Sequence, residues 1–126
     1  MAKISPTNET TNAILRFLFN AGIYSYRQNS LGVPIPGTGR FRSAPKTGLP
    51  DIVTILPPNG KHLGIEVKTG SDRLRPEQVG TLENIKRMGG AAFVVKDFED
   101  FKSQFETITS AQPELRAYIN QWTQRI

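Results

Sequence analysis

The chain has 126 residues, a formal net charge of +5 and no cysteine, and its length is that of one ordinary domain. The absence of cysteine excludes a disulfide framework, a thiolate metal site and a cysteine nucleophile, and it fits a reducing compartment such as the cytoplasm. The sequence has no apolar run long enough to span a membrane, and we expect no signal peptide at its polar start. We therefore expect a single cytoplasmic domain that covers residues 1–126.

All of the excess positive charge lies in the first 70 residues. These contain eight Lys and Arg residues against three acids, whereas residues 71–126 contain eight of each. A basic half of this kind indicates a polyanionic partner, most simply nucleic acid. The same charge is also compatible with a contribution to solubility alone.

The first half of the chain predicts one helix, one strand and a long loop. Residues 8–20 place apolar side chains at helical spacing, with Thr7 or Asn8 as the cap, Pro6 blocking extension backwards and Gly22 at the end. Residues 23–28 alternate and are rich in aromatic side chains, which is typical of a strand. Residues 29–50 contain four glycines and four prolines, which predicts a long loop.

The second half predicts a hairpin followed by further helices and a strand. Residues 51–56 and 63–68 are β-branched runs joined by a turn sequence at residues 57–60. A helix is expected from Pro76 until Gly89-Gly90 ends it, then a buried strand at 91–95 and helices at 97–109 and 113–124. The order α-β-β-β-α-β-α-α predicts a mixed α/β domain with helices packed against a central sheet.

The register of the hairpin decides whether three charged side chains meet. If Pro58 and Asn59 centre the turn, paired residue numbers sum to 117, and Asp51 lies opposite Glu66 on one face. Lys68 shares that face, because side chains along a strand alternate. A three-residue loop would shift the sum to 118 and separate the carboxylates. The sequence leaves both registers open.

The 117 register would create a site for metal-assisted chemistry. Two opposed carboxylates repel each other unless a cation lies between them, and carboxylate, carbonyl and water ligands suit Mg²⁺ or Mn²⁺. Such an ion activates water and polarises a phosphoryl oxygen. Lys68 would either orient that water or offset the negative charge that develops. The pattern predicts phosphodiester hydrolysis without a covalent intermediate.

These residues also match a family pattern, formed by Gly48-Leu49-Pro50-Asp51, Glu66-Val67-Lys68-Thr69, and Arg75-Pro76-Glu77-Gln78 with Gly89-Gly90. The chain resembles the PD-(D/E)XK nuclease superfamily, and within it the VRR-NUC branch of small virus-type replication-repair nucleases. The resemblance implies a restriction-endonuclease-like αβββαβ core over about residues 8–100, with a mixed central sheet flanked by helices. A C-terminal helical extension at about residues 110–126 falls outside the pattern.

The resemblance also implies a role for each matching residue. Asp51 and Glu66, with the carbonyl of Val67, would be the metal ligands, and Lys68 would be the catalytic lysine. Gln78 would support the site from its helix, and Glu9 would assist the metal through water. Stand-alone members resemble Holliday junction resolvases and act as homodimers on branched DNA. The expected activity is therefore that of a Mg²⁺- or Mn²⁺-dependent endodeoxyribonuclease.

Further residues are assigned to DNA or to structure. We expect DNA contacts from the loop and from the rim of the site, by Arg40, Arg42, Lys46, Arg73 and Arg75. We expect His62 to be structural. The aromatic residues near the C-terminus are expected in the core or in a dimer contact: Phe98, Phe101, Phe105 and Trp122. Two alternatives remain, a binding module that keeps the nuclease fold without cutting and a nuclease subunit that needs a partner.

Overall fold

The computed structural model describes residues 4–28, 33–42 and 48–124. Its helices are α1 (Pro6–Asn20), α2 (Pro76–Arg87), α3 (Phe98–Ala111) and α4 (Pro113–Thr123). Its strands are β1 (Tyr24–Arg27), β2 (Val33–Ile35), β3 (Arg40–Arg42), β4 (Ile52–Leu56), β5 (Lys61–Val67) and β6 (Ala91–Val95). None of the helices in these ranges is both long and apolar enough to cross a membrane.

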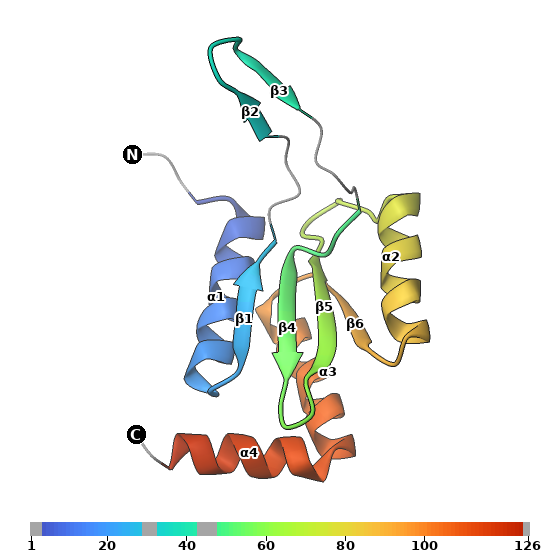
Figure 1. The fold of residues 1–126 in the computed structure, drawn as a ribbon. Helices are drawn as coiled ribbons and strands as arrows, with labels where there is room; N and C mark the ends of the chain where they lie inside the picture. Colours follow the sequence, from blue (N-terminus) through green and yellow to red (C-terminus); the bar gives the residue numbers. More distant parts are fainter. Residues whose placement is uncertain (1–3, 29–32, 43–47, 125–126) are drawn as a thin grey trace.

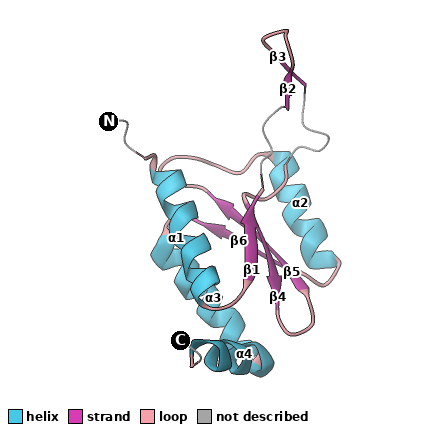
Figure 2. Ribbon diagram, turned by 60° about the vertical axis from the view of Figure 1, so that its left-hand side comes forward, coloured by secondary structure: helices cyan, strands magenta, loops and turns pink. Residues whose placement is uncertain are grey.

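The centre of the fold is a four-stranded mixed sheet in the order β1-β4-β5-β6. The pairs β1–β4 and β4–β5 are antiparallel, whereas β5 and β6 are parallel and α2 connects them. Helices α1 and α3 cover one face of the sheet and α2 lies on the other (Figure 2). The predicted α/β fold is confirmed, and α1, α2 and the strands of the central sheet follow the predicted αβββαβ order. The extra C-terminal helix is α4, which lies across the end of the sheet in Figure 1.

The start of α1 differs from the prediction. Ser5 is the N-cap, and its hydroxyl accepts a hydrogen bond from the backbone N–H of Asn8 at 3.1 Å. Pro6 is the first helical residue rather than a barrier, because its missing N–H would have had no partner in the first turn. The assignment of Thr7 or Asn8 as the cap is therefore wrong by two to three residues.

The end of α1 follows the sequence more closely. Gly22 adopts a φ of 76°, and the N–H of Ile23 reaches back to the carbonyl of Leu18 at 2.9 Å, which is the usual way a glycine ends a helix. The indole of Trp122 packs onto Gly22, where a Cβ would lie only 2.3 Å from the ring. The glycine therefore also allows α4 to dock.

Residues 29–50 were predicted to form one long loop, but part of this segment forms a hairpin. It contains β2 and β3, which pair antiparallel with Val33 opposite Arg42. The turn between them has Gly37 and Gly39 at positive φ, which is why a glycine-rich sequence forms a hairpin here. The hairpin projects beyond one end of the sheet (Figure 1).

The aromatic residues of α3 fill the core. The ring of Phe17 meets the rings of Phe98, Phe101 and Phe105 edge-on, with centroids 5.5–6.0 Å apart. Phe101 and Phe105 are buried and Phe98 is half-buried, so of the two roles considered for them, core packing is the one observed. Because these rings are used inside the domain, they give no support to a dimer contact.

Candidate active site

The β4–β5 pairing decides between the two hairpin registers. Ile52 lies opposite Ile65 and Leu56 lies opposite Lys61, so the paired numbers sum to 117. Continuing by one residue beyond β4 places Asp51 beside Glu66. The first register is confirmed and the alternative, which would have separated the carboxylates, is wrong.

A cavity of about 310 Å³ opens at this end of the sheet. It lies where β4 begins, β5 ends and the first turns of α1 and α2 approach. The residues that line it are Thr7, Asp51, Glu66, Val67, Lys68, Asp72, Arg73, Arg75 and Gln78. Seven of these nine residues were assigned to the site from the sequence. The seven lie between Asp51 and Gln78, which are 27 residues apart in the chain.

Glu66 is the buried acid of this cleft. Its side chain is only 1% exposed, and its Oε1 accepts a hydrogen bond from Nε2 of Gln78 at 3.2 Å. Its other oxygen, Oε2, is buried with no hydrogen-bond partner among the described residues. Burial, together with the adjacent Asp51 carboxyl, raises the pKa of Glu66 to about 8, although the charges of Lys68 and Arg75 act in the opposite direction.

Gln78 owes its orientation to the start of α2. The backbone N–H of Arg75 donates to Oε1 of Gln78 at 2.9 Å, so the side-chain NH₂ is directed at Glu66. Pro76 occupies the first helical position, where proline is favoured, and a glutamine three residues after the cap commonly bonds back to the cap N–H. The same local interaction that begins the helix therefore positions a donor for the buried carboxylate.

Asp51 is held from two sides. Its Oδ2 accepts from the backbone N–H of Val67 at 2.7 Å, and its carbonyl accepts from the N–H of Gln28 at 2.7 Å. The segment leading to it packs against α2 at Gly48, which has a φ of 80° and where a Cβ would lie 2.6 Å from the carbonyl oxygen of Glu77. The glycine is needed for this close approach.

Lys68 lies immediately after β5. Its backbone N–H donates to the carbonyl of Val95 at 2.9 Å, which continues the parallel pairing with β6 by one residue. The half-buried side chain lines the cleft, and its charge opposes the rise in the pKa of Glu66. An ammonium group therefore lies beside the two carboxylates, as the alternation of the strand predicts.

The donor set of the cleft fits a hard divalent cation. An unpartnered carboxylate oxygen in a buried position is costly, and Oε2 of Glu66 is such an oxygen. Asp51, the second carboxylate, and the Val67 carbonyl are oxygen donors of the kind that Mg²⁺ and Mn²⁺ bind together with water. Within residues 4–28, 33–42 and 48–124, no three or more His, Cys, Asp or Glu side chains are grouped to hold a metal, so side chains alone do not complete a coordination shell.

Other residues assigned from the sequence lie elsewhere. Glu9 is exposed in the first turn of α1 and is not among the residues that line the cleft. Arg40 is exposed on the projecting hairpin. Arg42 is the last residue of β3, and both its side chain and Lys46 lie outside what the structure describes. Arg75 pairs with Glu77 at 3.5 Å while lining the cleft.

Two residues of the cleft were missed. Thr7 was treated only as a helix cap, yet its hydroxyl lies 2.6 Å from the hydroxyl of Thr69, just after Lys68. Asp72 is an exposed third carboxylate at the rim. Its place in the turn after the Glu-x-Lys strand was a usable signal, whereas the contact of Thr7 is purely tertiary.

His62 lies away from these residues. It is exposed near the start of β5 and lines a different cavity of about 590 Å³ beside the C-terminal end of α2. It pairs with Ile55 in the β4–β5 ladder. His62 is therefore separate from the cleft, and the expectation that it is structural stays a prediction.

Comparison with known proteins finds a family and a solved structure that resemble this chain. Residues 40–98 match the VRR-NUC domain family. A solved structure described as a VRR-NUC domain protein superimposes with a TM-score of 0.58, covering 84% of this chain and 89% of the other at 19% identity. The resemblance to the VRR-NUC branch is confirmed. The match includes Asp51, Glu66, Val67, Lys68 and Gln78, whereas Glu9 precedes it. No curated protein matches the sequence significantly.

Proposed function

We propose that this VRR-NUC domain is a metal-dependent DNA endonuclease that hydrolyses phosphodiester bonds. The observation that carries the proposal is the meeting of Asp51, Glu66 and Lys68 in one cleft, with Oε2 of Glu66 buried and unpartnered. A buried oxygen of this kind cannot belong to an ion pair on the protein surface, whereas it is well suited to bind a cation. The VRR-NUC match and the nuclease-type fold support a nuclease as the general class.

In this proposal the central residues of the cleft have separate tasks. Asp51 and Glu66, with the carbonyl of Val67, hold Mg²⁺ or Mn²⁺, which when bound polarises a phosphoryl oxygen and lowers the pKa of water. Lys68 stabilises the negative charge that grows on the phosphate. Gln78 acts through Glu66 as a positioning residue.

DNA is the proposed substrate because arginine side chains lie at the rim of the cleft. Arg73 and Arg75 line it directly, and the hairpin that carries Arg40 and Arg42 projects beyond the same end of the sheet (Figure 1). Such contacts position the DNA backbone without reading its base sequence.

We further propose that the protein prefers branched DNA such as Holliday junctions and cuts it as a homodimer. Paired cuts on opposite strands need two active sites related by a two-fold axis. Sedimentation of the chain as a monomer at high concentration would contradict the dimer.

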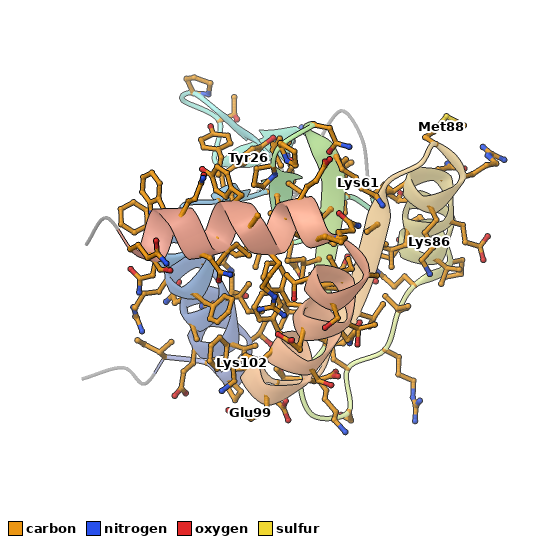
Figure 3. The ribbon with its side chains drawn as sticks, turned by 90° about the horizontal axis from the view of Figure 1, so that it is seen from below. Tyr26, Lys61, Lys86, Met88, Glu99 and Lys102 are labelled. Carbon is orange, nitrogen blue, oxygen red and sulfur yellow. The ribbon has the colours of Figure 1, made fainter. Side chains whose placement is uncertain are left out.

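A cleavage assay tests the activity. The substrates are a four-way junction, a splayed duplex, a linear duplex and single-stranded DNA, each with Mg²⁺, Mn²⁺ or EDTA. The test variant is Lys68→Ala and the matched control is Lys61→Ala. Lys61 begins the same strand but lies at the other end of the sheet, visible in Figure 3 from the side opposite the cleft.

We expect cutting with either metal, none with EDTA, a loss of about 100-fold or more in Lys68→Ala and none in Lys61→Ala. Equal loss in both lysine variants would contradict a catalytic role for Lys68. Salt-sensitive binding of DNA without cutting would favour the binding module or a nuclease subunit that needs a partner.

A further inference from the structure

Arg27 lies at the cleft end of the sheet, on the edge strand. It is the last residue of β1 and pairs with Ile52, the residue after Asp51. The next residue, Gln28, donates its backbone N–H to the carbonyl of Asp51 at 2.7 Å. The end of β1 is thus bonded directly to the segment that carries the first carboxylate, although Arg27 itself is not among the residues that line the cleft.

The guanidinium of Arg27 is held in place by a neutral partner. Its Nη2 donates to Oδ1 of Asn8 at 2.6 Å, and Asn8 follows Thr7, which lines the cleft. Asn8 is itself fixed in the first turn of α1, where its backbone N–H is bonded to the Ser5 hydroxyl. One corner of the guanidinium is therefore anchored while the side chain stays exposed.

This cation has no acid to neutralise it among residues 4–28, 33–42 and 48–124. The ion pairs there are Arg75–Glu77, Lys102–Glu99 and Arg116–Glu106. Glu9 lies next to Asn8 in the sequence but forms no ion pair with Arg27 within this part of the chain. A guanidinium has five N–H donors in a planar fork, so most of its donors remain available to a phosphate.

We infer that Arg27 binds a DNA backbone phosphate on the β1 side of the cleft, across from Arg73 and Arg75. The inference rests on the proposed function and adds the path of the substrate. β1 lies on one side of β4 and β5 lies on the other, so Arg27 at the end of β1 and the two rim arginines, which follow β5, flank the carboxylates. A DNA backbone that crosses this end of the sheet would therefore meet a cation before and after them. Arginine side chains therefore contact the DNA backbone on both sides of the bond to be cut.

Binding of DNA in EDTA tests this without cleavage. A labelled four-way junction and a linear duplex are titrated with the whole chain by fluorescence anisotropy at several salt concentrations. The variants are Arg27→Ala, Arg27→Lys and Asn8→Ala. Arg16→Ala is the matched control, because Arg16 is an exposed arginine further along α1. Circular dichroism melting of each variant reports any loss of folding.

Removal of one phosphate contact lowers the slope of log K against log salt by about 0.9 and weakens binding severalfold. We expect this for Arg27→Ala and not for Arg16→Ala. Arg27→Lys is expected to keep the slope with weaker binding, because the charge stays but the planar fork is lost. Asn8→Ala is also expected to keep the slope and weaken binding, because the guanidinium of Arg27 is no longer held by Asn8.

An Arg27→Ala protein with the affinity and slope of Arg16→Ala would overturn the inference. So would a variant that melts at lower temperature while its slope is unchanged, because Arg27 would then only tie β1 to α1. A third outcome is that the Arg27 variants bind DNA as expected while the wild type cuts no DNA with Mg²⁺ or Mn²⁺. That outcome would overturn the proposed nuclease and support the phosphate contact of Arg27. Absence of any DNA binding would overturn both.

Discussion

Gln78 bonds one oxygen of Glu66 and leaves the other buried and without a partner. The donor is Nε2 of Gln78, 3.2 Å from Oε1, while Oε2 is the oxygen without a partner among the described residues. A carboxylate in this state has two ways to lower its energy, by taking up a proton or by binding a cation. The raised pKa of Glu66, about 8, is the first of these, and the proposed metal is the second.

The first prediction concerns stability against pH in metal-free protein. The pKa of Glu66 is raised from 4.5 to about 8, so between these values the folded protein holds a proton that the unfolded chain has released. The free energy of unfolding therefore falls as pH rises through this window, by a few kcal/mol in all. Urea unfolding in EDTA at pH 5 to 9 measures the trend.

The matched control for this titration is Glu66→Gln. The amide has nearly the same shape and cannot ionise, so its free energy of unfolding should lose this part of the pH dependence and exceed that of the wild type at high pH. The same fall with pH in both proteins would show that another group is responsible.

The second prediction concerns metal binding without DNA. A cation that binds only the folded protein stabilises it by about 2.7 kcal/mol at roughly 100 times its Kd, which is a rise on the order of 10 °C in Tm for a domain of this size. We expect Mn²⁺ and Mg²⁺ to produce this rise in the wild type. Asp51→Ala and Glu66→Gln should lose it, and Glu83→Ala, at an exposed position of α2, should retain it. An unchanged rise in Asp51→Ala would place the metal elsewhere.

The third prediction concerns Gln78 as a positioning residue. Its NH₂ stabilises the charged form of Glu66, so Gln78→Ala should raise the pKa of Glu66 further. The acidic limb of the pH–rate profile should move to higher pH, and kcat should fall about tenfold with little change in KM. The comparison is Gln104→Ala, which removes an α3 side chain that donates a hydrogen bond to the Val94 carbonyl of β6. A lower rate without a shift of the profile would contradict the assigned role.

The fourth prediction concerns the close approach of Gly48 to α2. In Gly48→Ala the new Cβ would meet the Glu77 carbonyl at 2.6 Å in a backbone conformation of positive φ. We expect a loss of about 2–4 kcal/mol in the free energy of unfolding. Gly60→Ala has a similar φ of 79° with no atom within 4 Å, so it should cost only the backbone strain, about 1–2 kcal/mol. Equal losses measured by urea unfolding would show that the contact with α2 is unimportant.

The predicted elements and the observed ones agree where a local rule decides. The β4–β5 hairpin, the start of α2 at Pro76 and the stop at Gly89 follow from turn and capping chemistry, which acts between neighbours in the chain. Two assignments were wrong: the cap of α1, where Ser5, Thr7 and Asn8 are all suitable capping residues close together in the sequence, and the loop predicted over residues 29–50. The hairpin β2–β3 has only three residues in each strand, too few to show a periodic pattern among eight glycines and prolines.

The candidate site divides in the same way. Asp51, Glu66 and Lys68 were identified from the sequence because two strands joined by a short turn leave only two registers, and strand alternation places side chains on a known face. The buried and unpartnered Oε2 of Glu66 and the hydrogen bond from Gln78 depend on β6, which pairs with β5, and on α2, which packs against it. The contact of Thr7 with Thr69 and the anchoring of Arg27 by Asn8 depend instead on the packing of α1 against the sheet. The sequence alone determined which groups are present and which local turns bring them near, because those interactions act over a few residues. The tertiary structure decided which of them are buried, paired or left open, because burial depends on segments distant in the chain.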